Sequence, residues 1–485
     1  MSILVLTNIG SRDVLQNGEV IKPAREEGKR LLDTYDSCAE LLTFPIVEPL
    51  IRYLLARHPE ETINLYLFGT DQPDPKFQST DTLYFTRLMA RRLPVMLGER
   101  LHAQVVDVKD INPSYYDRAF EAYGRLLPDL LKREIATCYV ALAGGVPACN
   151  TALLLQAVRY FGDRLEVLYT PIDGEPIPIR VGRQILSSFR EAAALERLEQ
   201  LDFTGALPLM RSLGASPGLC HLAEYAVRRL DFDFQVARHA LEEVLAEGDE
   251  DLRDWVTKTL RHDLDLLLGE ADSTTRLAAL LRELNWNAAI CWKHRRYADF
   301  LSRVYRFQEA ALRYLIEKIF DLPTDMGPKT AQTTLQRWEE GIQARPELRE
   351  YLEHPEKKID WRLISRPVYK AMLSFAVEEE HADKNTLLSA SERQQYAALL
   401  ERVNALDPLV ELRHRTIVGH DFQGVSEEIL LKASPRRKGQ PVQPPDVLDE
   451  IVKMTLLDPP GKFSRDHNPY LQIAQYLVSK LKDSN

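Results

Sequence analysis

The feature that most constrains the fold is a change of sequence pattern between the first third of the chain and the rest of its 485 residues. Short runs rich in β-branched residues alternate with amphipathic helical stretches up to residue 181, and from residue 184 only the helical pattern continues. Strands separated by helices are typical of βαβ units, which build a mainly parallel sheet. We therefore expect an N-terminal α/β domain of Rossmann-like type, followed by an all-α region.

The same pattern predicts the individual elements and their grouping. Strands are expected at residues 3–7, 62–68, 103–108, 136–141 and 165–169, with an extended segment at 177–181, and helices near 45–57, 80–97, 114–134 and 147–160. We predict three parts: an α/β domain at 1–182, a helical spacer at 183–270 with a repeat-like stretch at 185–260, and a helical domain at 271–485. Within the last part we expect a loop at 321–330 and a flexible, basic, proline-rich excursion at 434–445.

Composition excludes several classes of protein. No window approaches 18 consecutive apolar residues, so a transmembrane helix is excluded, and the N-terminus has the pattern of a first strand rather than of a signal peptide. Five widely spaced cysteines with no C-x-x-C pair indicate reduced thiols in the cytoplasm and no zinc site. A net charge of −10 argues against a surface that binds nucleic acid everywhere, but it is compatible with a local basic cleft.

Polar loops follow three of the predicted strands, in TNIGSRDV, LFGTDQPDPKFQSTDTLYF and ALAGGVPACNTALLL. Ligands of parallel sheets lie beyond the carboxyl ends of the strands, and the backbone N–H groups at a helix start attract phosphate. Neither the dinucleotide-binding pattern nor the Walker pattern is present, so we expect a different phosphate-bearing small molecule. For GGVP taken alone, a plain tight turn is the competing interpretation. The candidate ligand-binding residues are Asn8, Gly10, Ser11, Thr70, Gly144, Gly145, Pro147 and Asn150.

A basic cluster interrupts the acidic chain at LRHRTIVGHDFQG, residues 412–424. Arg415 and His420 form an R-x4-H pattern, and Arg413 and His414 add to its positive charge. Histidine exchanges protons near neutral pH, and arginine stabilises charge that develops on phosphate oxygens. These residue types therefore suit metal-independent RNA cleavage. The competing interpretation is a basic helix end with a glycine in its last turn.

Two observations bear on which residues of the cluster matter. A second R-x4-H match, from Arg349 to His354, contains two glutamates that would repel a phosphodiester, whereas the 415–420 match contains no acid. On an ideal helix Arg415 and His420 would be about 140° apart, and Arg413 and His420 only about 20° apart. A site within one chain would therefore favour Arg413, and a site shared by two copies could use either arginine.

A further basic stretch, CWKHRRYADF at residues 291–300, offers Lys293, His294 and Arg296 as possible RNA contacts. We interpret it instead as an amphipathic helix with a solvated basic face.

The strand-one loop and GGVPACNTALLL together resemble the CARF domain (CRISPR-associated Rossmann fold), over about residues 1–182. The resemblance implies that the ligand is a cyclic oligoadenylate bound at a dimer interface by the residues named above. Valine at position 146 replaces a threonine that is frequent in such domains, which removes one side-chain hydrogen bond. We prefer cyclic tetra-adenylate over hexa-adenylate as the activator, and slow cleavage of the activator in this domain is a further possibility.

The stretch ALDPLVELRHRTIVGHDFQGVSEEIL, in an all-α region after a CARF-like domain, resembles the R-x4–6-H motif of HEPN ribonucleases. Chains of this kind are similar to the standalone ribonucleases of type III CRISPR antiviral systems, the Csm/Csx branch. The resemblance implies a homodimer with a composite ribonuclease site, in which Arg415 and His420 take the motif positions. In a longer register Arg413 takes the arginine position and His414 follows it.

These observations predict a cytoplasmic, cyclic-oligoadenylate-activated endoribonuclease that needs no metal and cleaves single-stranded RNA by attack of the 2′-OH. The expected products are 2′,3′-cyclic phosphate and 5′-OH ends. The alternative is a cyclic-oligonucleotide-sensing regulator without nuclease activity, although the sequence shows no winged helix-turn-helix.

Overall fold

The computed structural model describes residues 2–130, 135–171, 174–269, 272–357, 359–378, 387–455 and 468–483. It divides into two compact units, Met1–Arg190 and Glu191–Asn485, and the division falls inside helix α7 (Val181–Glu199). The predicted boundary between spacer and second helical domain, at residues 270 and 271, lies outside the described residues.

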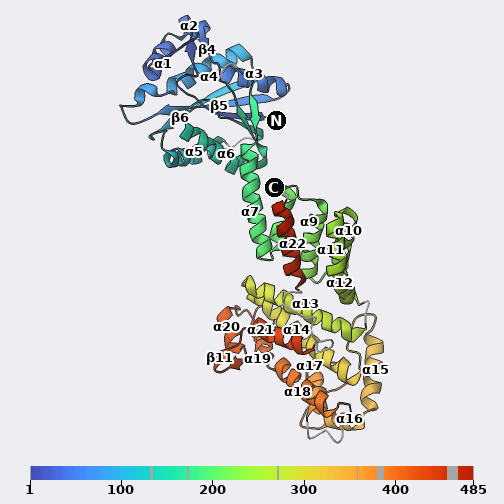
Figure 1. Ribbon diagram of the computed structural model, residues 1–485. Coiled ribbons are helices and arrows are strands. Elements are labelled where there is room, and N and C mark those ends of the chain that lie inside the picture. Colours follow the sequence, from blue (N-terminus) through green and yellow to red (C-terminus); the bar gives the residue numbers. More distant parts are fainter. Residues whose placement is uncertain are drawn as a thin grey trace. The chain divides into compact units, whose positions relative to one another are not determined.

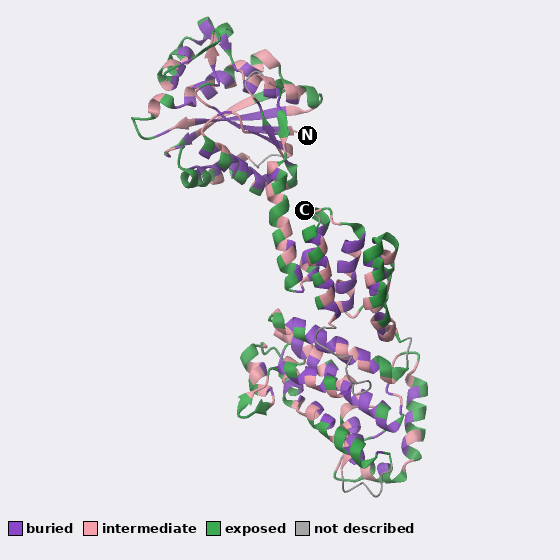
Figure 2. Ribbon diagram, viewed as in Figure 1, coloured by how far each residue is buried: buried purple, intermediate pink, exposed green. Residues whose placement is uncertain are grey.

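A six-stranded sheet with the order β6-β5-β1-β7-β8-β9 forms the centre of the first unit, and it is parallel except for β9. Side chains of a strand alternate between its two faces, so Ile3 and Val5 of β1 enter one core while Leu4 and Leu6 enter another. Helices α1, α3 and α4 supply the first core, and α5 and α6 the second (Figure 1). Figure 2 shows the sheet buried between these two helical layers.

The elements of this unit follow the predicted order. They are β1 (Ser2–Asn8), β2 (Leu15–Gln16), β3 (Glu19–Val20), α1 (Ala24–Asp33), α2 (Tyr35–Cys38), β4 (Leu42–Thr43), α3 (Val47–Arg57), β5 (Thr62–Asp71), α4 (Leu83–Leu97), β6 (Leu101–Lys109), α5 (Tyr116–Leu130), β7 (Ile135–Ala141), α6 (Pro147–Phe161), β8 (Leu165–Tyr169) and β9 (Ile177–Ile179), with short 3-10 turns at Ala39–Leu41, Gln78–Thr80 and Gly162–Arg164.

The sequence-based prediction of this unit is confirmed in its main elements and wrong in its details. All five long strands form where expected. The extended segment predicted at 177–181 is shorter, because Val181 already begins α7. Residues 131–134 of the predicted helix at 114–134 lie outside the described residues. The small sheet β3-β2-β4 was not predicted, because strands of two residues have no readable periodicity.

The second unit consists of helices that share two cores. α13 contributes to both: Leu281 and Leu284 enter one core, and Trp286 and Ile290 enter the other. The C-terminal α22 packs with α9 in the second core, far from its sequence neighbours (Figure 1). The helices are α8 (Phe203–Ser212), α9 (Pro217–Leu230), α10 (Phe234–Glu247), α11 (Glu250–Thr259), α12 (Arg261–Leu268), α13 (Ser273–Lys293), α14 (Tyr297–Phe320), α15 (Ala331–Gln343), α16 (Pro346–Glu353), α17 (Arg366–Val377), α18 (Ala390–Asn404), α19 (Asp407–Leu412), α20 (Glu427–Ala433), α21 (Pro444–Thr455) and α22 (Pro469–Asp483).

Three helix-to-helix turns in this unit share one backbone geometry. Leu201, Phe232 and Arg295 each have a positive φ, near 60°. In each turn the N–H of the next residue donates to the carbonyl oxygen five residues before it: Asp202 to Arg197, Asp233 to Arg228 and Arg296 to Cys291. The three hairpins α7–α8, α9–α10 and α13–α14 are thus closed in the same way.

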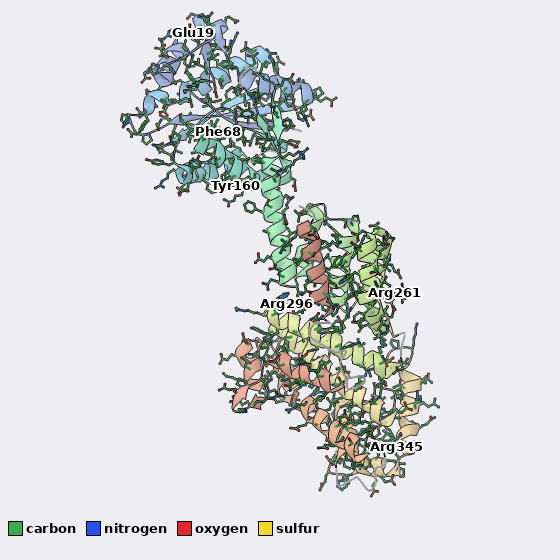
Figure 3. All side chains as sticks on the ribbon, viewed as in Figure 1. Glu19, Phe68, Tyr160, Arg261, Arg296 and Arg345 are labelled. Atoms are coloured by element: carbon green, nitrogen blue, oxygen red, sulfur yellow. The ribbon has the colours of Figure 1, made fainter. Side chains whose placement is uncertain are left out.

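The basic stretch at 291–300 is such a turn and not the continuous amphipathic helix that we predicted. α13 ends at Lys293 and α14 begins at Tyr297, and Arg296 lies between them (Figure 3). Lys293 Nζ donates to the carbonyl oxygen of Glu199 at 2.9 Å, and His294 Nε2 lies 2.6 Å from that of Gln200. Two basic side chains therefore satisfy carbonyl groups at the C-terminal end of α7.

The two loops predicted in the last third of the chain have different outcomes. Residues 321–330 contain no regular element, as expected, and Asp325 accepts hydrogen bonds from Gly327 and Thr330. The excursion at 434–445 contains a short β-hairpin of β10 (Arg436–Arg437) and β11 (Gln440–Pro441), which the prediction of a flexible segment did not include. No helix among the described residues is long and apolar enough to cross a membrane. The five cysteines are buried free thiols, as expected.

A buried ion pair joins three helices of the second unit. Arg229 on α9 donates to Glu283 Oε2 on α13 through Nε at 3.0 Å and Nη2 at 2.7 Å, and both side chains are essentially inaccessible to solvent. Tyr225 accepts from Arg229 at 2.8 Å, and the hydroxyl of Tyr470 on α22 donates to Glu283. The carboxylate is thereby bound from both neighbouring helices.

We expect Arg229→Ala to lower the free energy of unfolding of the helical unit by about 3–5 kcal/mol, because it leaves Glu283 buried without its cation. Arg228→Ala is the matched control. Its ion pair with Glu224 is partly exposed to solvent, so the expected loss is at most about 1 kcal/mol. Urea unfolding followed by circular dichroism measures both. Equal losses in the two variants would contradict the assigned role of the pair.

Candidate functional site

Two polar loops meet where the strand order of the sheet reverses. β5 and β6 lie on one side of β1, and β7 and β8 on the other, so the topological switch point falls between β1 and β7. A Cβ on Gly10 would lie 2.8 Å from the nitrogen of Gly145, and one on Gly144 would lie 2.5 Å from the carbonyl oxygen of Asn8. Gly145 also has a φ of +82°. Glycine is therefore required here for the loops after β1 and β7 to touch.

Asn8, the last residue of β1, connects both loops through its side chain. It is 3% exposed, its Nδ2 donates to Asn150 Oδ1 at 2.8 Å, and its Oδ1 accepts from the hydroxyl of Tyr123. Asn150 Nδ2 in turn donates to the carbonyl oxygen of Gly144 at 2.7 Å. The two asparagines thus hold the loop backbones in place.

The structure brings together most of the residues predicted at this site. Asn8, Gly10, Gly144, Gly145 and Asn150 form one cluster, which we call the switch-point cluster. Ser11 follows Gly10 and is half-buried, and Pro147 is the exposed first residue of α6.

Thr70 belongs to a different polar group, at the end of β5. Its N–H donates to Thr82 Oγ1 at 3.1 Å, and the N–H of Thr82 donates back to Thr70 Oγ1 at 3.3 Å. Thr70 therefore fixes the start of α4 to the end of β5, one strand away from the switch point.

Two residues of the switch-point region were missed from the sequence. Asp13 Oδ2 accepts from the N–H of Gly10 at 2.8 Å, and Asp13 is 2% exposed. Burial raises the pKa of Asp13 to about 6, and the hydrogen bond from Gly10 opposes that shift. The acid was visible in TNIGSRDV as the one carboxylate of the loop. Tyr123 lies on α5, and no local pattern could indicate that its hydroxyl reaches Asn8.

The R-x4-H stretch is a loop rather than a helix, so the ideal-helix angles predicted for it were wrong. α19 ends at Leu412, Arg413–Arg415 form one 3-10 turn, and the chain then becomes extended at Thr416. Thr416 is fully buried and bridges to Gln423. We call residues 413–423 the RH loop.

The four predicted catalytic side chains have different surroundings. The rings of His414 and His420 stack with centroids 5.8 Å apart at an interplanar angle of 18°. The guanidinium carbon of Arg413 lies 4.0 Å from the ring centroid of Tyr305 on α14. His414, Arg415 and His420 are exposed, whereas Arg413 is half-buried. Arg413 is thus attached to the helical core by a cation–π contact, and Arg415 is available to solvent.

A polar network fixes the helix that leads into the RH loop. Asp407, the first residue of α19, binds the ammonium group of Lys370 and accepts from Gln308 Nε2 at 2.7 Å. Gln308 is fully buried on α14 and also donates to the carbonyl oxygen of Val403 at 2.9 Å. The start of α19 is therefore held against α14, α17 and α18.

In the competing R-x4-H match the arginine is bound by a glutamate of the same helix. On α16 Arg349 Nε donates to Glu353 Oε1 at 2.8 Å, and this contact lowers the pKa of the Glu353 carboxyl. His354 caps the helix next to Pro355. Its arginine is thus paired with one of the two glutamates that the sequence places inside this match.

Comparison with solved structures identifies a protein of similar fold. No protein-family model and no curated protein matches the sequence. Among solved structures, Enterococcus italicus Csm6 bound to cyclic hexa-2′-fluoro-hexa-dAMP is similar over 99% of this chain and 99% of its own, with a TM-score of 0.54 and 13% sequence identity. The chain has the Csm6 fold.

The likeness to Csm6 confirms the predicted fold class, which is a CARF-like α/β domain with a mainly parallel sheet followed by an all-α, HEPN-like region. The similarity to Csm6 also includes the helices between the α/β domain and the C-terminal helical region, since the match extends over nearly the whole chain. At 13% identity the Csm6 likeness establishes the fold, and the roles of single residues rest on the geometry described above.

We expect Asp13→Asn to stabilise the protein at pH 7.5 and to change little near pH 4. The folded protein keeps a proton on Asp13 up to about pH 6, whereas the unfolded chain releases it near pH 4. The free energy of unfolding of the wild type therefore falls by up to about 3 kcal/mol as the pH rises through this range. Asparagine does not titrate, so the variant does not lose this stability.

Urea unfolding at pH 4.5 and 7.5 measures this pH dependence. Asp163→Asn is a control of opposite sign, because a contact with Arg190 lowers the pKa of that exposed carboxyl and its contribution is present above pH 4. A gain in Asp13→Asn that is the same at both pH values would contradict the prediction.

We expect Gly419→Ala to destabilise the RH loop and Gly424→Ala to leave it intact. A Cβ on Gly419 would lie 2.1 Å from the carbonyl oxygen of Arg413, whereas a Cβ on Gly424 would meet nothing within 4 Å. Hydrogen exchange of the amides at Thr416, Ile417 and Gly419, which donate within this region, measures the effect. Equal exchange in both variants would show that the tight turn does not persist in solution.

Proposed function

We propose that the protein is an endoribonuclease switched on by cyclic oligoadenylate, which acts in the cytoplasm in type III CRISPR antiviral defence. The observation that carries the proposal is the RH loop: Arg415 and His420 are exposed on a turn that is anchored to the helical core, in a chain with the Csm6 fold. The ligand named for the similar Csm6 structure supports a cyclic oligonucleotide as the activator.

The proposed reaction uses the protein's own side chains and no metal ion. A neutral imidazole of the RH loop accepts the proton of the ribose 2′-OH as O2′ attacks phosphorus. The P–O5′ bond breaks, and a second, protonated imidazole gives a proton to O5′. The products are a 2′,3′-cyclic phosphate and a 5′-OH end. The stacked pair His414 and His420 supplies two imidazoles within one protomer.

We assign the phosphate-stabilising role to Arg415 and a positioning role to Arg413. Arginine stabilises the transition state through direct contact with phosphate oxygens, and Arg415 is exposed. Arg413 is half-buried on Tyr305, where it orients the 3-10 turn that carries Arg415.

We propose the switch-point cluster as the binding site for the activator. Its position at the topological switch point of a parallel sheet, beside the start of α6, is where phosphate-bearing ligands bind in such folds. The sequence-based preference is cyclic tetra-adenylate, whereas the similar Csm6 structure holds a cyclic hexanucleotide analogue. The experiment below therefore compares both ring sizes and follows any cleavage of the activator.

We also propose that the active form is a homodimer in which two RH loops approach each other. Ile417 and Phe422 in this loop are 66% and 91% exposed, which leaves two apolar side chains in water beside the proposed site. Exposed apolar groups of this kind are typical of protein interfaces, and a second copy of the loop would cover them.

We expect the purified protein to cleave labelled single-stranded RNA in EDTA only after cyclic tetra- or hexa-adenylate is added. His420→Ala should lower the activated rate by about 10²–10⁴-fold and Arg415→Ala by about 10²–10³-fold, because each removes a group that acts on the reacting phosphodiester. Arg413→Ala should cause a smaller loss, since it acts through the loop. Gel analysis of the RNA and chromatography of the activator measure both reactions.

The double variant Arg349→Ala, His354→Ala is the matched control, because it removes an R-x4-H pair of identical spacing whose arginine is bound by Glu353. Its activity should equal that of the wild type. RNA that stays intact with both activators would exclude the nuclease and favour a sensing regulator. Cleavage that persists in His420→Ala would exclude the RH loop as its site.

A further inference from the structure

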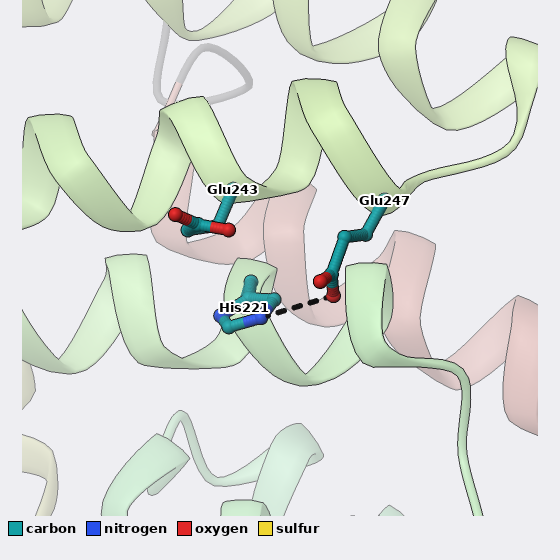
Figure 4. Close-up of side chains that lie close together, drawn as sticks. All are labelled: His221, Glu243 and Glu247. Carbon is teal, nitrogen blue, oxygen red and sulfur yellow. Dashed lines mark ion pairs between the residues drawn. The ribbon is translucent and has the colours of Figure 1, made fainter.

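Three potential metal ligands converge between helices α9 and α10. His221 projects from α9, and Glu243 and Glu247 lie one turn apart on α10. Figure 4 shows the imidazole and both carboxylates directed toward one another across the helix pair. His221 Nε2 lies 3.3 Å from Glu247 Oε2, and one ligand atom of each residue lies within 4.8 Å of the other two.

Within the described part of the chain, neither carboxylate of this group forms an ion pair with a lysine or arginine. Among the described residues, Glu247 forms its ion pair with His221, and Glu243 forms its own with His239, one turn earlier on α10, at 3.8 Å. Glu224 on the neighbouring α9 is different, because Arg211 and Arg228 both bind it. The group therefore places two carboxylates, neither paired with a lysine or arginine among the described residues, beside an imidazole nitrogen.

The helices that carry these ligands are fixed by their own packing. Leu222 and Ala226 of α9 and Leu241 and Val244 of α10 are buried in one core. A Cβ on Gly218 would lie 2.7 Å from Gly248 Cα, so the start of α9 touches the end of α10. The ligand side chains stay accessible to an ion from solvent, with 28% of the His221 side chain and 47% of Glu247 exposed.

We infer that His221, Glu243 and Glu247 bind a divalent transition metal ion, Zn²⁺ being the preferred one, and that the ion clamps α9 to α10. One imidazole nitrogen and two carboxylate oxygens form a mixed donor set that favours Zn²⁺ over Mg²⁺ or Ca²⁺, which prefer oxygen ligands alone. Three protein ligands leave a coordination position for water. The expectation of no zinc site rested on cysteine spacing and does not bear on ligands that come from two helices.

The experiment uses full-length protein stripped with EDTA and then freed of chelator. ZnCl₂ is titrated in competition with a fluorescent chelator, and MgCl₂ is titrated in parallel. We expect the wild type to bind one equivalent of zinc. His221→Ala and Glu247→Gln should each abolish this binding or weaken it at least about tenfold, because residues that only hydrogen-bond to a metal ligand already contribute about 10–100-fold to metal affinity. Zinc should also raise the Tm of the wild type by about 3 °C or more, and not that of Glu247→Gln.

His262→Ala is the matched control, because it removes an exposed histidine of α12 that is outside the group. It should bind zinc as the wild type does. The metal-free variants should melt at the wild-type Tm, which separates lost coordination from lost folding. Zinc binding that is unchanged in both ligand variants, or stabilisation by MgCl₂ equal to that by ZnCl₂, would overturn the inference. The readout is independent of ribonuclease activity.

Discussion

The buried ion pair between Arg229 and Glu283 determines how the helical unit is assembled. α13 lines both helical cores, and the carboxylate that it buries is bound by α9 on one side and by α22 on the other. A charge pair excluded from water is tolerated only when all its hydrogen-bonding partners are in place. Docking of α9, α13 and α22 is therefore coupled, which explains why the C-terminal helix packs beside α9 and not beside α21.

The α13–α14 hairpin held by this ion pair contacts both the end of α7 and the RH loop. Its turn binds the carbonyl groups at the end of α7 through Lys293 and His294. α14 then contacts the RH loop through Tyr305, and Tyr297 near its start donates to Glu427 of α20 at 2.7 Å. The end of α7 and the RH loop are thus connected through side chains of a single hairpin.

The sequence predicts the elements well and their connections poorly, for physical reasons. Runs of β-branched residues located every long strand, and the polar loops at the ends of β1 and β7 located the switch point. The turns at Leu201, Phe232 and Arg295 could not be predicted, because these residues adopt a positive φ that is usually indicated by glycine or asparagine. Helical geometry was assumed for the RH loop because no neighbouring residue in the sequence indicates that Thr416 is buried in the core. The role of Tyr123 depends on a partner 115 residues away.

In the proposed activator site and in the RH loop, some residues hold the backbone in place and others remain free to contact a ligand or substrate. Asn8 and Arg413 were both predicted to contact ligand or substrate. In this structure Asn8 is hydrogen-bonded to Asn150 and Tyr123, and Arg413 lies on the face of Tyr305. A side chain held in this way is preorganised and cannot turn to a ligand without losing those contacts. In the RH loop Arg415 stays exposed together with His414 and His420, and these are the three side chains that the proposed reaction uses.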